Sequence, residues 1–235
     1  MSVKLYEKAQ FRVAGDRGLL VEYGDGIALR VNRKVRAMAI VVEQKLPTGV
    51  VEILPTYRSL LVVYDPGKTT LQNLRVEILR LEEQMADIHI PPPKIVKIPV
   101  CYGGEFGPDI QFVAESHDLE IEEVVRMHSQ AAYPIYMIGF TPGFPFLGGL
   151  PQNLQTPRLE TPRTRVPEGS VGIANAQTGI YPVASPGGWQ IIGRTPLKIF
   201  SSERENPFLY QAGDMIHFEP INEDAYHRIL KDEAL

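Results

Sequence analysis

The run Ile90-Pro91-Pro92-Pro93-Lys94 divides this 235-residue sequence into two parts of different character. Three consecutive prolines hold the backbone extended and remove the amide donors that a helix or a sheet would need. Amphipathic elements are complete before the run, and a new strand pattern begins after it at residues 95–100. The sequence therefore predicts two domains, residues 1–90 and residues 95–235.

The first part alternates strands with amphipathic helices. Apolar residues recur at spacings of three and four over residues 31–46 and again over 71–85, which is the period of a helix. Strand-like segments at 11–23, 50–54 and 59–64 are bounded by turn residues. The order strand, helix, strand, strand, helix predicts a small α/β sandwich whose helices face the core.

The second part is dominated by residues 139–196, a segment rich in glycine and proline. It contains 10 glycines and 9 prolines, and its strand-like pieces are short. The strands expected in and after this segment are residues 170–174, 180–184, 189–192, 197–200 and 215–220. The helices expected around it are residues 109–116, 121–128 and 223–230. Many short strands joined by Gly/Pro turns predict a closed barrel or a sandwich, so the fold class of the whole chain is α+β.

The composition excludes several classes of protein. Hydrophobic residues make up 44% and charged residues 22%, which is typical of a globular chain rather than a disordered one. A net charge of −4 argues against general nucleic-acid binding, which needs a basic face. One cysteine, Cys101, excludes an intrachain disulfide, and the histidines lack H-x-x-x-H spacing, so no metal site is expected.

No membrane span or export signal is expected either. The N-terminal residues lack an apolar core of signal-peptide length, which predicts a cytoplasmic protein. No Lys, Arg, Asp or Glu occurs between Arg126 and Arg158, but prolines and glycines interrupt this stretch repeatedly. A spanning helix needs about 20 apolar residues with continuous backbone hydrogen bonding.

Two segments nearly match motifs of enzyme active sites, but neither matches the motif in full. Residues 188–195 nearly match the phosphate loop G-x-x-x-x-G-K-[ST], with Arg194 in place of the lysine. Such a loop must open a helix, whereas Pro196 follows here and residues 197–200 are typical of a strand. The run Glu168-Gly169-Ser170-Val171-Gly172 lacks the first glycine of a G-x-S-x-G nucleophile elbow. The sequence therefore predicts no complete ATP site and no nucleophile–base pair.

Three blocks of aromatic, glycine and proline residues remain. They read Gly139-Phe140-Thr141-Pro142-Gly143-Phe144, Val166-Pro167-Glu168-Gly169-Ser170-Val171-Gly172-Ile173 and Ser185-Pro186-Gly187-Gly188-Trp189. Glycine lets a backbone approach a ligand closely, and arginine binds carboxylate or phosphate through two parallel hydrogen bonds. Arg163, Arg165 and Arg194 belong to the same segment, which has no Asp, Lys or His.

These blocks resemble those of the KipI family, also called allophanate hydrolase subunit 1-like. The resemblance implies a small N-terminal α+β domain followed by a cyclophilin-like β-barrel. It also implies a non-autonomous part of an ATP-dependent 5-oxoprolinase, which opens the lactam of 5-oxoproline to glutamate. The implied partners are a second subunit of homologous fold, which is allophanate hydrolase subunit 2-like or the C component of 5-oxoprolinase, and the A component of the same enzyme. ATP would then be used through the complex, and the isolated chain would be inactive.

Two residues depart from the family pattern. Glu168 stands where the family often has Ala, which adds a negative charge among the arginines. Asn175 stands where the family often has Gly. Because Asn tolerates a left-handed backbone, the turn at this position is expected to persist.

The implied chemistry assigns expected roles to particular residues. A phosphorylated lactam needs cations and few acids nearby, so the three arginines are expected to converge on one anion-accepting cleft with Trp189 in its wall. The residues expected at the substrate or anion are Arg163, Arg165, Arg194, Gln177, Ser185 and Trp189. The loop expected to meet a ligand or partner comprises Gly139, Phe140, Pro142, Gly143 and Phe144. His128 is the nearest candidate for a general base.

Structural roles and other functions compete with this assignment. His128 also fits a packed helical histidine, the arginines fit pairing with Glu160 or Glu168, and the phenylalanines fit a core. The alternative function is a KipI-type regulatory protein that inhibits a sporulation histidine kinase. A prolyl isomerase is suggested by the barrel resemblance alone, and a fold does not determine a function.

Overall fold

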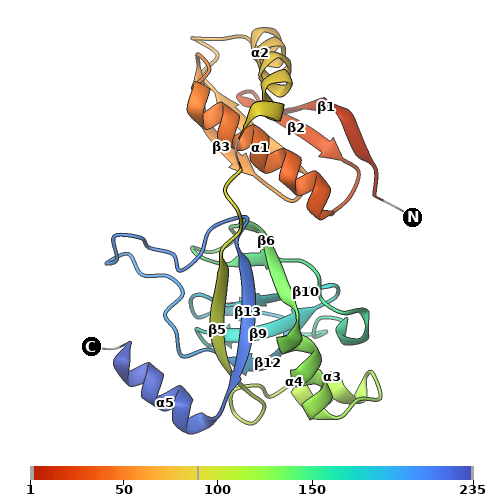
Figure 1. The fold of residues 1–235 in the computed structure, drawn as a ribbon, viewed down its shortest axis with the longest axis vertical. Helices are drawn as coiled ribbons and strands as arrows, with labels where there is room; N and C mark the ends of the chain where they lie inside the picture. Colours follow the sequence, from red (N-terminus) through yellow and green to blue (C-terminus); the bar gives the residue numbers. More distant parts are fainter. Residues whose placement is uncertain (1–2, 89, 234–235) are drawn as a thin grey trace. The chain divides into compact units, whose positions relative to one another are not determined.

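The computed structural model describes residues 3–88 and 90–233. The chain divides into two compact units, Met1–Pro92 and Pro93–Leu235, each with its own sheet and helices (Figure 1). Each unit also has its own large hydrophobic cluster. The predicted α+β fold class is confirmed.

The N-terminal unit is a four-stranded antiparallel sheet covered on one face by two helices. Its elements are β1 (Leu5–Ala14), β2 (Gly18–Gly24), α1 (Leu29–Lys45), β3 (Val50–Pro55), β4 (Ser59–Tyr64), α2 (Leu71–Glu83) and the 3-10 turn η1 (Gln84–Asp87). The strand order is β1-β2-β4-β3. Alternate residues of β2, such as Leu19 and Val21, form one core with the apolar stripes of both helices. The predicted sandwich of strands and core-facing helices is therefore present.

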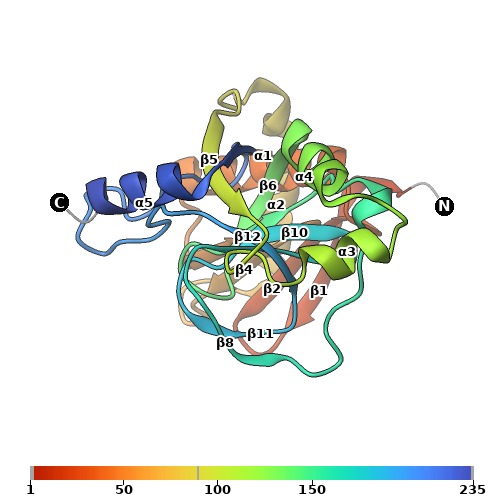
Figure 2. The ribbon, with the colours of Figure 1, turned by 90° about the horizontal axis from the view of Figure 1, so that it is seen from below.

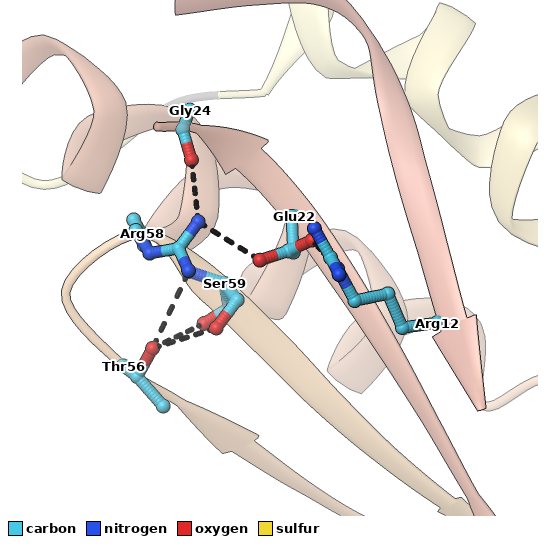
Figure 3. A network of polar contacts seen from close by, with 6 residues as sticks. All are labelled: Arg12, Glu22, Gly24, Thr56, Arg58 and Ser59. Atoms are coloured by element: carbon cyan, nitrogen blue, oxygen red, sulfur yellow. Dashed lines mark hydrogen bonds and ion pairs between the residues drawn. The ribbon is translucent and has the colours of Figure 1, made fainter. Parts of the chain in front are cut away.

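The opposite face of this sheet carries a buried carboxylate, which Figure 3 shows with its partners. Glu22 alternates with the core residues of β2, yet its side chain is only 2% exposed. Arg12 of β1 forms an ion pair with one of its oxygens, and Arg58 Nη1 lies 2.8 Å from the other. Arg58 also donates to the carbonyl oxygen of Gly24 at 2.8 Å. The two arginines thus cover Glu22 and tie β1, β2 and the β3–β4 turn together.

The C-terminal unit is a seven-stranded sheet that nearly closes into a barrel. Its strands are β5 (Ile95–Tyr102), β6 (Ala132–Ile138), β7 (Pro145–Leu147), β9 (Ser170–Ala174), β10 (Gln177–Ile180), β12 (Gln190–Arg194) and β13 (Met215–Ile221). They follow the order β10-β9-β12-β5-β13-β6-β7. β13 runs parallel to β5, and the other neighbouring pairs are antiparallel. The end strands β10 and β7 lie in contact, which brings the edges of the sheet together.

The remaining elements surround this barrel-like sheet. They are α3 (Ile110–Glu115), α4 (Ile121–Gln130), η2 (Gln152–Leu154), β8 (Arg163–Val166), β11 (Ser185–Gly187) and α5 (Glu223–Asp232). β8 and β11 pair as a separate two-stranded ribbon, seen in Figure 2. Figures 1 and 2 both place α5 on one side of this unit and α3 with α4 on the other. No helix in the described ranges is long and apolar enough to cross a membrane.

Two predicted strands of the C-terminal unit are wrong. Strand β10 ends at Ile180, so residues 181–184 form no strand; Pro182 has no amide to donate to a ladder. Residues 197–200 also form no regular strand, although Ile199 is fully buried. These residues are apolar because they form a buried loop. A short apolar run in a buried loop has the same sequence pattern as a short buried strand.

Other sequence expectations agree with the structure. Strands β9, β12 and β13 and helices α3, α4 and α5 occupy the predicted regions. Asn175 adopts a left-handed backbone, with φ of 51°, between β9 and β10, so the expected turn persists. The near-match to a phosphate loop falls mainly in strand β12, Gln190–Arg194, rather than in a loop that opens a helix.

Candidate functional site

Arg163 is held by an acid that the sequence analysis did not consider. Its Nη2 lies 2.6 Å from Asp109 Oδ1, and its Nη1 donates to the carbonyl oxygen of Trp189 at 3.4 Å. The second oxygen of Asp109 accepts the amide of Ile191 at 2.6 Å. Asp109 therefore joins β8 to β12 through Arg163. For Arg163, the competing account of a structural ion pair therefore applies, with Asp109 as the partner in place of Glu160 or Glu168.

The other two arginines have separate surroundings. Arg194 lies over the ring of Phe106, with its guanidinium carbon 6.0 Å from the ring centroid. Burial raises the pKa of Tyr226, and the charge of Arg194 and its hydrogen bond to Tyr226 act in the opposite direction. Arg165 is exposed on β8 and forms no ion pair within the described ranges. The structure gives these arginines different neighbours, and their expected convergence on one anion-accepting cleft stays a prediction.

His128 is a packed core residue rather than a general base. It is fully buried and stacks on Phe218 with 4.6 Å between ring centroids. Its Nδ1 lies 2.8 Å from the hydroxyl of Tyr102, and its Nε2 lies 2.8 Å from Thr178 Oγ1. Thr178 donates its proton to the carbonyl of Gly172, so it accepts from Nε2–H and leaves Nδ1 to accept from Tyr102. Both ring nitrogens are thereby used inside the barrel.

Burial also sets the protonation state of this histidine. Loss of hydration lowers the pKa of His128 to about 3, because no acid compensates a positive charge there. Both nitrogens of the neutral imidazole are engaged by Tyr102 and Thr178, so neither is free to take a proton from a substrate. The catalytic role expected for His128 is therefore corrected by its position in the core.

Gln177 and Ser185 lie at strand ends of the C-terminal unit. Gln177 begins β10 and is half-buried opposite Ala174. Ser185 begins β11 opposite Val166, and its hydroxyl is buried without a hydrogen-bond partner in the described structure. Their expected roles in ligand binding stay predictions.

An aromatic pocket collects residues from the first and third sequence blocks. Its volume is about 270 Å³. The residues that line it are Phe140, Phe144, Phe146, Arg158, Tyr181, Pro186, Gly187, Gly188 and Trp189. Phe144 meets both Trp189 and Tyr181 edge to face, with ring centroids 5.5 Å and 5.8 Å apart. Such edge-to-face packing holds the walls in place without filling the space between them.

Two glycines are required for these walls to take their positions. A Cβ on Gly179 would lie 3.1 Å from Trp189 Cζ3 and 3.3 Å from Phe144 Cζ, so strand β10 leaves room for both rings. A Cβ on Gly187 would lie 2.3 Å from the hydroxyl oxygen of Tyr181. Glycine at both positions therefore lets aromatic side chains approach the backbone directly.

The loop of residues 139–144 forms one side of the pocket and is locally strained. Phe140 has φ of 69°, a left-handed conformation that is unusual for a bulky residue, and its side chain is 78% exposed. Tyr210 donates to the carbonyl oxygen of Gly143 at 2.8 Å, which anchors the loop from below. The anchored loop thus holds an apolar ring in solvent at the pocket mouth.

The charge carried by the pocket lining is positive. Burial raises the pKa of Tyr181, while a backbone hydrogen bond from Trp189 and the charges of Arg158 and Arg163 act against that rise. Arg158 is the only charged residue among those that line the pocket. Arg163 is neutralised by Asp109, which leaves Arg158 as the cation available to a ligand.

Arg158, Tyr181 and Phe146 are functional candidates that the sequence does not predict. Arg158 lies outside the three blocks, and nothing in its spacing distinguishes it from Arg163 or Arg165. Their surroundings distinguish Arg163 from Arg158. Asp109 lies beside Arg163, whereas no acidic residue lines the pocket that contains Arg158. Tyr181 adjoins the third block, and an aromatic residue between glycine-rich turns is the signal that could have identified it.

Comparison with known proteins places this fold in a family. A model of the carboxyltransferase domain, subdomain C and D, matches residues 9–210. The B component of the 5-oxoprolinase of Bacillus subtilis is 40% identical over 228 residues, which cover 93% of this chain and 95% of that protein. The chain belongs to the family of 5-oxoprolinase B components. The family resemblance inferred from the three sequence blocks is thereby confirmed.

Two solved structures resemble this chain in fold and sequence. A conserved uncharacterized protein from Pyrococcus horikoshii is 42% identical, covers 92% of this chain and 100% of its own, and superposes with a TM-score of 0.56. The protein designated TTHA0988 is 36% identical over 88% of this chain, with a TM-score of 0.79. This chain spans 40% of that solved chain.

No metal centre is formed by the residues at 3–88 and 90–233. No group of three or more His, Cys, Asp or Glu side chains in these ranges is arranged to hold an ion.

Proposed function

We propose that this chain is one component of an ATP-dependent 5-oxoprolinase, a cytoplasmic complex that opens 5-oxo-L-proline to L-glutamate. The observation that carries the proposal is the match to the B component of 5-oxoprolinase along nearly the whole length of both chains. The aromatic pocket with its single arginine adds a place where a small anionic ligand fits.

The chain acts as a non-autonomous part of this enzyme. The near-match to a phosphate loop falls mainly in strand β12 rather than in a loop that opens a helix, and His128, the histidine nearest to the three blocks, is sealed in the core. A lactam is a poor electrophile, and phosphorylation of its oxygen by ATP would activate it. We assign ATP binding to the complex assembled with the A and C components of the enzyme.

The loop of residues 139–144 is the surface we assign to one of these companion components. Phe140 is 78% exposed although it is apolar, and its left-handed backbone keeps it there. An exposed aromatic ring held on a rigid loop is typical of an interface anchor. A companion that covers Phe140 would also close the mouth of the pocket, which completes the site at the boundary between the two chains.

Co-expression with the two companion components tests this function. We expect 5-oxoproline-dependent ATP hydrolysis by the complex and none by the isolated chain. Turnover by the purified chain alone would contradict its non-autonomous role, and a complete complex without 5-oxoproline-dependent hydrolysis would contradict the function itself.

A matched pair of variants tests the interface loop. Phe140→Ser should reduce recovery of the companion components in co-purification. Phe112→Ser is the control, because Phe112 is also an exposed aromatic residue, at 51%, but lies on α3 away from the loop. Equal recovery with both variants would remove the loop from the interface.

The alternative of a histidine-kinase inhibitor predicts a different partner. The same co-purification distinguishes the two functions, because an inhibitor would bind the kinase in the absence of the companion components. Recovery of the companion components with 5-oxoprolinase activity favours the enzyme.

A further inference from the structure

We propose that the aromatic pocket binds a small cyclic monocarboxylate, with its carboxylate at Arg158 and its ring against Trp189 and Phe144. The size, walls and charge of the pocket lead to this class of ligand. The identification of the ligand as 5-oxoproline rests on the proposed function.

The size of the pocket favours a small ligand. Pockets for drug-sized molecules have volumes of about 300–1,000 Å³. This pocket has about 270 Å³ and is bordered by the rings of Phe144, Tyr181 and Trp189. A nucleotide would exceed this space, whereas a single five-membered ring with one substituent would not.

The charge of the pocket favours one carboxylate. Arg158 is the only charged residue in its lining, and it forms no ion pair with any residue at 3–88 or 90–233. A carboxylate can take two parallel hydrogen bonds from a guanidinium group. A triphosphate would need more cations than this pocket offers, since Arg163 is already paired with Asp109.

The absence of an acid among the lining residues gives the pocket selectivity against ammonium groups. The nitrogen of 5-oxoproline is an uncharged amide, so the ligand carries a single negative charge. Proline and glutamate carry an ammonium group that would find only Arg158 as a charged neighbour. A charged group that is desolvated without a partner is strongly unfavourable. The same pocket would therefore hold the lactam and release glutamate after ring opening.

Residues 187–188 leave room for the ring beside the hydroxyl of Tyr181. Both residues are glycines, so no side chain separates their peptide groups from the pocket that they line. A Cβ added to Gly188 would have Pro162 Cγ as its nearest neighbour, at 3.5 Å. The carbonyl of Gly188 already accepts the amide of Leu159 at 2.7 Å, and Gly187 pairs with Arg163 of β8. The hydroxyl of Tyr181, which also lines the pocket, is therefore the polar group that we assign to the ring amide.

The single tryptophan provides a direct measurement. Trp189 is the only tryptophan of the chain and lies in the pocket wall, so its fluorescence reports on this site alone. Titration with 5-oxo-L-proline should change the emission in a saturable manner. 2-Pyrrolidinone, which has the lactam ring but no carboxylate, and L-proline, which adds an ammonium group, should bind at least about tenfold more weakly. Equal responses to all three compounds would overturn the proposal.

Two arginine variants separate the pocket from general surface charge. Arg158→Met should raise the Kd for 5-oxo-L-proline about tenfold or more, because it removes the charged hydrogen bonds to the carboxylate. Arg228→Met is the matched control, since Arg228 of α5 is also exposed but does not line the pocket, and it should leave Kd unchanged. An unchanged Kd in Arg158→Met would contradict the assignment.

The assembled complex distinguishes this inference from the proposed function. In the complex, Arg158→Met should raise KM for 5-oxoproline about tenfold relative to Arg228→Met. If the complex hydrolyses ATP with 5-oxoproline but neither KM nor the fluorescence titration responds to Arg158→Met, the function holds and the pocket assignment fails. If the titration follows the expected order but the complex lacks activity, the pocket assignment holds for cyclic monocarboxylates and the function fails.

Discussion

The cluster around Glu22 in the N-terminal unit and the aromatic pocket of the C-terminal unit use arginine in opposite ways. Glu22 is 2% exposed and is covered by Arg12 and Arg58 (Figure 3). In the pocket, Arg158 lies among aromatic and glycine residues, and no acid is among the lining residues. The first arrangement neutralises a buried charge within the protein, and the second leaves a positive charge for something outside it.

Arg163 shows that this distinction does not follow sequence neighbourhood. It lies five positions from Arg158, yet its guanidinium is bound by Asp109 at 2.6 Å. The presence or absence of a protein carboxylate therefore separates an architectural arginine from one that can bind a ligand.

Removal of a cation from Glu22 should have the largest effect on stability. Arg58→Met leaves a carboxylate that is 2% exposed with Arg12 as its remaining ion-pair partner. The free energy of unfolding should fall by about 3 kcal/mol, the low end for breaking a buried pair. Urea denaturation followed by circular dichroism measures this change. Adding Glu22→Leu should recover most of the loss, and Arg80→Met, which breaks an exposed pair on α2, should be indistinguishable from wild type.

Arg163→Met should cost less but should still destabilise the C-terminal unit. It removes a charged hydrogen bond to Asp109, whose side chain is 12% exposed, and leaves that carboxylate with the Ile191 amide. We expect a loss of about 1.5–3 kcal/mol in the free energy of unfolding. Asp109→Asn keeps an acceptor for the Ile191 amide and should cost less than Arg163→Met. The reverse order in urea denaturation would show that the ion pair is not the main contribution.

Burial of His128 should make the free energy of unfolding depend on pH, although no charged group is its partner. Its folded pKa of about 3 lies below the unfolded value near 6.5, so unfolding takes up a proton between these values. The contribution is fully present above about pH 6.5 and decreases by about 1.4 kcal/mol per pH unit as the pH falls, or about 2 kcal/mol at pH 5. Urea denaturation at pH 7.5 and pH 5 measures it. His128→Gln should lose less stability between these two pH values than wild type does, and an equal loss would contradict the buried neutral state.

Arg158→Met should have the smallest effect on stability. Arg158 is exposed and has no carboxylate partner in the described part of the chain, so the free energy of unfolding should stay within about 0.5 kcal/mol of wild type. The same protein should show the loss of 5-oxo-L-proline affinity described above. A large drop in melting temperature for this variant would place Arg158 with Arg163 among the architectural arginines.

Local patterns in the sequence were sufficient for much of the fold. The spacing of Val31, Val35 and Met38 reports the face of α1 that is buried, because neighbours on a helix are set by chain geometry alone. The three sequence blocks were sufficient to identify the family. The domain boundary at the proline run stays a prediction. The two compact units of the structure meet at Pro92 and Pro93, within that run.

The function of each arginine and of His128 was decided only by the tertiary structure. Arg163 is 54 positions from Asp109, and His128 is 50 positions from Thr178, so no local pattern relates either residue to its partner. The barrel brings these segments together, and burial then sets which charges are neutralised, which groups lose their protons and which arginine stays available. Helix and strand periods depend on nearest neighbours along the chain, whereas charge, solvation and pKa depend on neighbours in space.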